Sequence, residues 1–349
     1  MNSTTQELHD FGYRFIGPVV TAFFDKVLAC CSGHEPKTLY FLAREGYFLK
    51  QLFDHYQVIS GCRPELKSQY LLCSRAFLFK LALADKKLIP STLQHHYKGS
   101  LLNFLTRRFG FSGADINKIM VRLPHITAQM ESEVKLPSEA VRIEKVLTDI
   151  SQLFRSELQA KSELYAEYLK GLGFRNGPLN VLDIGFTGTI QTLLSAMTGE
   201  STIGHYMVTT SRAKDTDSCQ YYGHLSSGQS FGKGYPMIDR SLYLESVLTA
   251  PHGQIIDIFS VNGQSRFGFA QKTRAQHHFE ILQQINEGAV SYMQDVLPDE
   301  TQLAAEDIPE YYAGIVADPA SFPMDLRAIL EVDDHISGFG VLNPAQLFG

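Results

Sequence analysis

Three short segments place charged or hydroxyl-bearing residues directly after an apolar run, a pattern typical of ligand-binding residues in α/β proteins. Residues 43–46 read Ala-Arg-Glu-Gly, residues 74–75 read Ser-Arg, and residues 183–189 read Asp-Ile-Gly-Phe-Thr-Gly-Thr. In open α/β sheets, ligands bind beyond the carboxyl ends of the strands. If the three apolar runs are neighbouring strands, two arginines, two carboxylates and a Thr-Gly-Thr turn meet at one edge of the sheet.

The Thr187-Gly188-Thr189 turn is the clearest local indication of chemistry. Gly188 lets the backbone approach an anion closely, and the threonines offer hydroxyls and N–H groups at the start of a predicted helix. The dipole and the unpaired donors of a helix start favour phosphate. The simpler alternative is that Thr187 or Thr189 only caps the helix. Asp183, at the preceding strand end, is suited to bind sugar hydroxyls or Mg²⁺, or to cap a turn.

Charged side chains elsewhere extend the candidate site. Arg44 and Arg75 follow two different apolar runs, and guanidinium groups make bidentate contacts with phosphate. The alternative for Arg44 and Glu45 is an ordinary exposed pair. Glu245 lies in the apolar context YLESVLTAPHG, where a carboxylate needs a partner or solvent.

Alternating strand-like and helix-like segments must position these residues. A strand-like run followed at once by a helix-like segment occurs at 38–43 and 44–56, at 69–74 and 75–84, and at 179–185 and 189–197. Further strand-like runs lie at 203–210 and 221–225. This alternation predicts an α/β fold with a Rossmann-like, mostly parallel sheet.

We expect one structural unit over residues 1–349. Its α/β core is predicted at about 1–84 and 176–270, a helical insertion without strands at about 85–175, and a C-terminal helical region at 271–349. Within these regions, apolar residues at helical spacing predict one continuous helix each at 11–31, 147–169 and 273–296.

Composition excludes several classes of protein. Lys and Arg total 31 against 37 Asp and Glu, a net charge of −6, whereas a general nucleic-acid binder is usually basic; we therefore expect no nucleic-acid partner. No stretch reaches the ~18 apolar residues of a membrane span, and the N-terminus lacks the pattern of a signal peptide. The five cysteines lack CxxC spacing, which argues against disulfides and structural zinc. We expect a cytoplasmic protein, with peripheral contact at the inner membrane left open.

The histidines offer weaker candidates. His95 and His96 are adjacent, and neighbours on a helix diverge by about 100°, so the pair is a poor chelate. His205 and His224 lie in strand-like runs, where we expect hydrogen-bonded sheet residues rather than catalysts.

Six segments, taken in order, resemble a family of bacterial surface-polysaccharide proteins. They are FIGPVVTAFFDKV (15–27), YFLAREGYFLKQLFD (40–54), LLCSRAFL (71–78), VLDIGFTGTIQTLL (181–194), YYGHL (221–225) and LESVLTAPHG (244–253). Members of this family were long labelled as relatives of haloacid dehalogenase hydrolases. They are better interpreted as glycan phosphoribosyltransferases, the first half of dual-domain ribofuranosyltransferases. The resemblance runs from about Gly12 to about Asp295 and implies a distinct glycosyltransferase fold that diverged from ordinary phosphoribosyltransferases.

Two positions depart from the family's pattern. Glu45 stands where the family has Asp, which moves a carboxylate by one methylene, and Phe186 stands where it has Trp. In addition, no segment supplies the Asp-x-Asp-x-Thr nucleophile loop of a haloacid dehalogenase phosphatase. The resemblance therefore implies the transferase half alone, with the 5-phosphate removed by a separate phosphatase.

The implied reaction transfers 5-phosphoribosyl from phosphoribosyl pyrophosphate to a sugar hydroxyl of a lipid-linked glycan, the acceptor, in the synthesis of O-antigen or capsule. Pyrophosphate leaves, and the configuration at C1 inverts from α to β. An inverting attack needs a base for the acceptor hydroxyl. Glu45 and Glu245 are both candidates for that base.

The resemblance also implies roles for the other site residues. Arg44 and Arg75, together with Mg²⁺, would clamp the pyrophosphate, because negative charge builds on it as it leaves. The turn at 187–189 would bind the 5-phosphate, and Asp183 the ribose 2- and 3-hydroxyls. No residue is assigned as a metal ligand.

Three alternatives stay open at this point. The first is a haloacid dehalogenase-type phosphatase, and the second a non-catalytic polysaccharide-assembly protein. The third, a nucleotide-salvage phosphoribosyltransferase, is disfavoured because the acidic pair that normally precedes its Thr-Gly-x-Thr loop is reduced to Asp183 alone.

Overall fold

A five-stranded sheet with all neighbouring pairs parallel lies at the centre of the computed structural model, which describes residues 3–31, 38–61, 66–334 and 338–348. In sheet order the strands are β2 (Lys67–Leu71), β1 (Thr38–Leu42), β5 (Leu179–Asp183), β6 (Thr202–Thr210) and β7 (Cys219–Gln229). Each strand overlaps a predicted one, although β2 begins two residues before the predicted run at 69–74 and ends three residues before it does. The α/β class and the parallel sheet are thus confirmed.

The helices that follow three of these strands also match the prediction. They are α2 (Glu45–Ile59) after β1, α3 (Arg75–Ala82) after β2, and α10 (Thr189–Thr198) after β5. From β1 the chain proceeds to β2 on one side, whereas β5, β6 and β7 lie on the other side. The strand order therefore reverses between β1 and β5, and the crevice at such a reversal is where open α/β sheets bind ligands.

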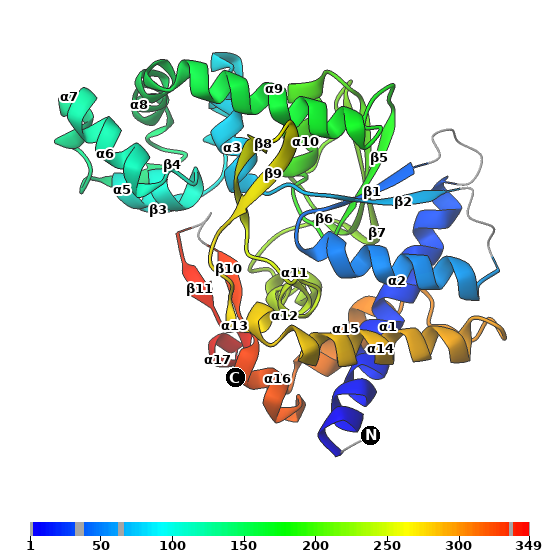
Figure 1. The fold of residues 1–349 in the computed structure, drawn as a ribbon. Helices are drawn as coiled ribbons and strands as arrows, with labels where there is room; N and C mark the ends of the chain where they lie inside the picture. Colours follow the sequence, from blue (N-terminus) through cyan, green and yellow to red (C-terminus); the bar gives the residue numbers. More distant parts are fainter. Residues whose placement is uncertain (1–2, 32–37, 62–65, 335–337, 349) are drawn as a thin grey trace.

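Side-chain alternation along β1 divides the core between the two faces of the sheet. Leu39 and Phe41 join one apolar cluster, while Tyr40 and Leu42 join the other, because successive side chains of a strand point to opposite faces. The first cluster contains residues of α1 (Ser3–Cys31), α2, α14 (Phe279–Val296) and α15 (Ile308–Val316). The second contains residues of α3, α9 (Arg155–Gly171) and α10. Figure 1 shows α1 and α14 below the sheet and α9 above it.

Glycines allow α1 and α14 to pack closely. A Cβ on Gly12 would lie 1.8 Å from the carbonyl oxygen of Ile285, and one on Gly288 would lie 1.9 Å from that of His9. The predicted helix over 11–31 is present, but begins at Ser3. The predicted helix over 273–296 is divided at His278 into α13 (Arg274–His277) and α14.

The prediction of an insertion without strands is wrong. Strands β3 (Tyr97–Ser100) and β4 (Glu133–Leu136) form an antiparallel pair, whose four-residue length gives little sequence signal. The helix predicted over 147–169 is two helices, α8 (Ala140–Leu153) and α9, because Phe154 leaves the helical conformation. The remaining short elements are η1 (Lys86–Leu88), α4 (Ile89–Thr92), α5 (Leu101–Asn103), a π-helical turn (Phe104–Arg108), α6 (Gly113–Arg122) and α7 (Pro124–Thr127).

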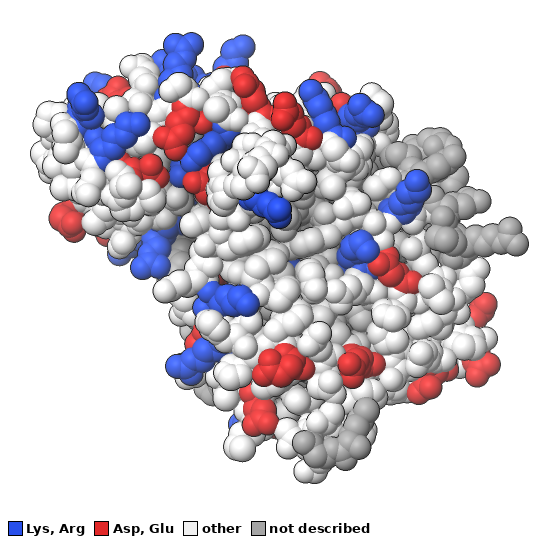
Figure 2. All heavy atoms as spheres, in the orientation of Figure 1, with Lys and Arg blue, Asp and Glu red and all other residues white. Residues whose placement is uncertain are grey.

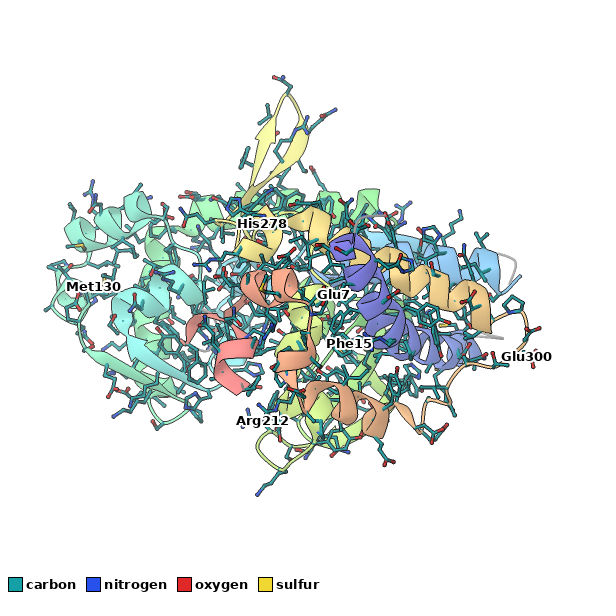
Figure 3. All side chains as sticks on the ribbon, turned by 90° about the horizontal axis from the view of Figure 1, so that it is seen from below. Glu7, Phe15, Met130, Arg212, His278 and Glu300 are labelled. Carbon is teal, nitrogen blue, oxygen red and sulfur yellow. The ribbon has the colours of Figure 1, made fainter. Side chains whose placement is uncertain are left out.

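Two further strand pairs lie outside the central sheet. The hairpin of β8 (Ile255–Val261) and β9 (Gln264–Phe269) projects from the body of the molecule in Figure 3. Strands β10 (Val332–Asp334) and β11 (Gly340–Leu342) pair within the C-terminal region, which was predicted to be helical. The other helices are α11 (Pro236–Asp239), α12 (Leu242–Val247), η3 (Pro319–Ser321), α16 (Met324–Ile329) and α17 (Pro344–Phe348).

The surface carries charges of both signs. On the face drawn in Figure 2, the basic side chains of the described residues alternate with acidic ones instead of forming one continuous basic patch. Within the described part of the chain, no helix combines the length and the apolar character needed to cross a bilayer.

Candidate functional site

A cavity of about 1400 Å³ opens at the carboxyl ends of the sheet strands. It is lined by every residue that the sequence proposed for a site: Arg44, Glu45, Arg75, Asp183, Thr187, Gly188, Thr189 and Glu245. All of these except Glu245 lie at or just after the ends of β1, β2 and β5. These three strands are neighbours in the sheet, which is why the polar residues at their ends meet. Glu245 comes instead from α12, which lies against the same opening.

The helices α2, α3 and α10 begin at this cavity. Arg75 is the first residue of α3, whose N-cap Ser74 accepts a hydrogen bond from the backbone N–H of Phe77 at 3.1 Å. Glu45 is the first residue of α2 and Thr189 the first of α10. Backbone N–H groups at helix starts lack partners within the helix and favour anions. The starts of α2 and α10 have no side-chain cap, so N–H groups there lack a side-chain acceptor, whereas the N–H of Phe77 in α3 is already bonded to Ser74.

Gly188 is required by the turn before α10. Its φ is 66°, a left-handed conformation that glycine adopts without strain, and a Cβ would lie 2.2 Å from the ring of Tyr221. As the N-cap of α10 it has no side chain to cap the helix. The simple capping alternative for Thr187 and Thr189 is wrong, because their hydroxyls lie 3.0 Å from each other and neither caps α10.

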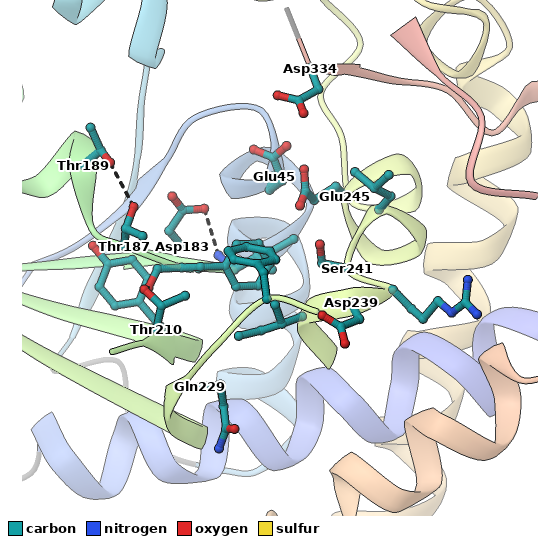
Figure 4. Close-up of a pocket in the computed structure, with 18 of the residues that line it drawn as sticks. Glu45, Asp183, Thr187, Thr189, Thr210, Gln229, Asp239, Ser241, Glu245 and Asp334 are labelled. Carbon is teal, nitrogen blue, oxygen red and sulfur yellow. Dashed lines mark hydrogen bonds between the residues drawn. The ribbon is translucent and has the colours of Figure 1, made fainter. Parts of the chain in front are cut away.

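The carboxylates of the cavity repel one another. Asp183 is buried, and burial together with the charge of Glu45 raises its pKa well above the usual range. Burial, Glu45 and Asp334 raise the pKa of Glu245 to about 7, although Arg75 and Arg44 oppose the rise. Figure 4 shows Glu45, Glu245 and Asp334 on one side of the cavity and Asp183 between them and the threonines. Arg75 and Arg44 thus only partly offset burial and the repulsion between these carboxylates at Glu245.

The opposite side of the cavity is positive. His95 lies there, and burial together with Arg75, Arg108 and Arg212 lowers its pKa to about 4. Its Nε2 lies 3.0 Å from the Thr189 hydroxyl. The cavity is consequently polarised, with the hydroxyls of Thr187 and Thr189 and the start of α10 at one end and a group of carboxylates at the other. Arg44 and Arg75 lie close enough to the carboxylates to lower the pKa of Glu245.

Sequence reasoning missed several lining residues. Asp334 is the last residue of the three-residue strand β10, which has no distinctive pattern, and His95 drew attention only as a poor chelate. Asp239 accepts hydrogen bonds from the N–H groups of Gly232 and Gly234, at 2.6 and 2.8 Å, and so fixes the turn that carries Phe231 into the cavity lining. Polar residues that lie far along the chain from the strands of the central sheet have no local sequence pattern that assigns them to the site.

A second group of possible ligands, Cys30, His205 and His224, is absent from the cavity lining. Nδ1 of His205 lies 3.0 Å from Nε2 of His224, with the rings within 8° of parallel and their centroids 5.2 Å apart. The two nitrogens therefore point almost directly at each other, as in a hydrogen bond, whereas metal ligands converge on a third point. Asn180 Oδ1 accepts a hydrogen bond from the other ring nitrogen of His205 at 2.9 Å. Both histidines are hydrogen-bonded sheet residues, as expected from the sequence.

Comparison with known proteins does not assign this chain to a family. None of the protein-family models matches it, and none of the curated protein sequences does. Functional interpretation thus depends on the chemistry of the cavity.

Proposed function

We propose that this protein is a glycan phosphoribosyltransferase that transfers 5-phosphoribosyl from phosphoribosyl pyrophosphate to a sugar hydroxyl. The observation that carries the proposal is the polarised cavity, in which anion-binding donors and carboxylates flank Asp183 at the reversal of strand order. The sugar donor, phosphoribosyl pyrophosphate, has a matching distribution of groups: a phosphate at one end, hydroxyls in the middle and a metal-binding pyrophosphate at the other end. The cavity volume of about 1400 Å³ leaves room for an acceptor sugar.

The 5-phosphate would lie at the start of α10. The backbone N–H groups there and the hydroxyls of Thr187 and Thr189 are donors in a part-buried site. Asp183 ends the central strand β5 beside this turn. Its carboxyl group is therefore in the right order along the cavity to bind the ribose 2- and 3-hydroxyls.

Arg44 and Arg75 would hold the pyrophosphate. Both line the cavity near the carboxylate group, since both lower the pKa of Glu245. Positive charge fixed beside a leaving group stabilises the transition state as negative charge builds on that group.

The carboxylates suit Mg²⁺, because carboxylate oxygens are ligands that Mg²⁺ prefers and because, after burial, the charge of Glu45 contributes to the raised pKa of both Asp183 and Glu245. Glu45 and Asp334 would hold the ion. When bound, Mg²⁺ would neutralise charge on the pyrophosphate oxygens.

In the transfer itself, the bond between C1 and the pyrophosphate oxygen breaks, and a bond forms between C1 and the acceptor oxygen. The hydroxyl proton moves to a carboxylate of this chain, and pyrophosphate leaves with the bonding electron pair. Of the two candidate bases, Glu245 is better supported, because a pKa of about 7 suits proton transfer near neutral pH.

We also propose that the sheet is a diverged glycosyltransferase and phosphoribosyltransferase fold. Support comes from the Asp183-to-Thr189 segment, which joins β5 to α10 at the reversal of strand order. The acceptor would be a lipid-linked glycan, the product a β-ribofuranosyl 5-phosphate, and a separate phosphatase would remove the 5-phosphate.

The test is to incubate the protein with phosphoribosyl pyrophosphate, Mg²⁺ and a panel of synthetic glycan acceptors, and to weigh the products. A mass gain of one phosphopentose, with release of pyrophosphate, is expected. Release of inorganic phosphate from ribose 5-phosphate conjugates by this chain alone would support a phosphatase instead. Absence of phosphoribosyl pyrophosphate binding in calorimetry with Mg²⁺ would support a non-catalytic role.

A further inference from the structure

A chain of three polar groups links the insertion to the turn before α10. Nε2 of His95 lies 3.0 Å from Oγ1 of Thr189, which lies 3.0 Å from Oγ1 of Thr187. His95 stands between α4 and β3, at the point where the insertion reaches the cavity. We propose that His95 is a positioning residue that donates a hydrogen bond from Nε2 to Thr189 and thereby leaves a threonine hydroxyl proton free to bind a phosphate.

Counting protons shows why the direction of this bond matters. Thr187 and Thr189 have one hydroxyl proton each. If Nε2 of His95 accepts, Thr189 donates its proton to the ring and Thr187 must donate its own to Thr189, so that neither proton is left. If Nε2 carries the proton and donates, the two threonines need only one proton for the bond between them. One hydroxyl proton is then available to an anion in the cavity.

The backbone around His95 is held by a buried arginine. Arg108 is fully buried, and its guanidinium donates hydrogen bonds to the carbonyl oxygens of Thr92, His95 and His96 at 3.1, 3.2 and 3.3 Å. The same group lies 5.2 Å from the ring centroid of Phe79. Because these contacts fix the loop on both sides of the ring, the imidazole meets Thr189 in a defined place.

The surroundings also determine the charge of the ring. Burial and the positive charges of Arg75, Arg108 and Arg212 lower the pKa of His95 to about 4, so the ring is neutral at pH 7. A neutral imidazole has one N–H group, on either nitrogen. A bound phosphate would select the Nε2–H form, because only that form leaves it a hydroxyl donor.

This inference rests on the proposed function, since it assumes that a phosphate binds at the turn. Ribose 5-phosphate is a suitable probe because it carries this phosphate without the pyrophosphate. The variants are His95→Gln, whose amide N–H reaches the position of Nε2, and His95→Asn, whose amide reaches only that of Nδ1. Gln94→Ala, an exposed neighbour outside the cavity lining, is the matched control.

Calorimetry should give dissociation constants for ribose 5-phosphate within about 3-fold of wild type for His95→Gln and Gln94→Ala. His95→Asn should bind at least about 10-fold more weakly, as expected for loss of a hydrogen bond to a charged group, with the melting temperature unchanged. Equal binding by His95→Asn and wild type would overturn the inference. Equally weak binding by His95→Gln and His95→Asn would also overturn it, because the ring would then act only through packing.

A double-mutant cycle covers the case in which His95→Asn is unstable. Thr189→Val removes the hydroxyl with little change in shape, and His95→Ala removes the ring; combining the two should weaken binding no further than Thr189→Val alone. If the losses of binding free energy in the two single variants add in the double variant, the proposed hydrogen bond between His95 and Thr189 is contradicted. If wild type fails to bind ribose 5-phosphate and phosphoribosyl pyrophosphate alike, the proposed function falls as well. If wild type binds both compounds but the variants do not bind as expected, only the role of His95 is rejected.

Discussion

The carboxylates of Glu45 and Glu245 face the same side of the cavity, although α2 and α12 lie far apart in the chain. Burial and the nearby charge of Glu45 raise the pKa of Glu245 to about 7. Because the carboxylate is costly to ionise here, the folded protein without ligands bears a local electrostatic strain that a cation would relieve.

This relationship predicts a pH-dependent stability. The pKa of Glu245 is higher in the folded state than in the unfolded state, so its contribution to stability is present below about pH 4.5 and is lost as the pH rises through about 7. The melting temperature of the protein in EDTA should therefore fall by several degrees between pH 5 and pH 8. Asp183, whose pKa is also raised, acts in the same direction.

Glu245→Gln should flatten this profile, since the amide does not ionise. Glu300→Gln, which changes an exposed glutamate outside the cavity lining, is the control and should leave the profile unchanged. A Glu245→Gln profile as steep as that of wild type would show that the strain lies elsewhere.

Removing a single charge from the cavity should stop transfer without unfolding the protein. Asp183→Asn loses the carboxylate assigned to the ribose hydroxyls, and Arg44→Ala loses a guanidinium assigned to the pyrophosphate. Each should lower kcat/KM by at least about 100-fold, with the melting temperature within a few degrees of wild type. Full activity in either variant, with unchanged melting, would reject the assignment.

The turn before α10 should tolerate no side chain on its glycine. Gly188→Ala combines a left-handed φ of 66° with a contact of 2.2 Å to Tyr221, and should cost about 2–4 kcal/mol of unfolding free energy. Gly199, at the other end of α10, has a φ of 76°, but a Cβ there would meet no atom within 4 Å, so Gly199→Ala should cost only about 1 kcal/mol. Chemical denaturation measures both; equal losses would mean that the Tyr221 contact relaxes freely.

The packing of α1 against α14 should also be disturbed by a side chain on one of its glycines. Gly288→Ala places a methyl 1.9 Å from the carbonyl oxygen of His9, which must push the two helices apart at a cost of about 1–3 kcal/mol. Gly314 lies on an exposed face of α15 with open space around it, so Gly314→Ala should raise stability by up to about 1 kcal/mol. Because the two substitutions are expected to change the free energy of unfolding in opposite directions, one denaturation series distinguishes the effect of helix packing from that of helix propensity.

The amino-acid sequence by itself determined the central sheet and the polar ends of its strands. The strand-like runs at 38–43, 69–74 and 179–185 are short, and each precedes a helix-like segment, so local pattern was sufficient to find strands β1, β2 and β5. Parallel pairing then required their carboxyl ends to lie at one edge. The short strands β3 and β4 were missed because four residues of alternation are too few to stand out.

Only the tertiary structure decided which distant residues complete the cavity. Asp334 and His95 come from segments without a distinctive pattern, and they reach the site because the C-terminal region and the insertion fold back over the strand ends. The protonation of Glu245 likewise follows from burial and from charges brought in by other elements. Local spacing specifies local structure, whereas charge interactions act through space between segments that no short-range pattern connects.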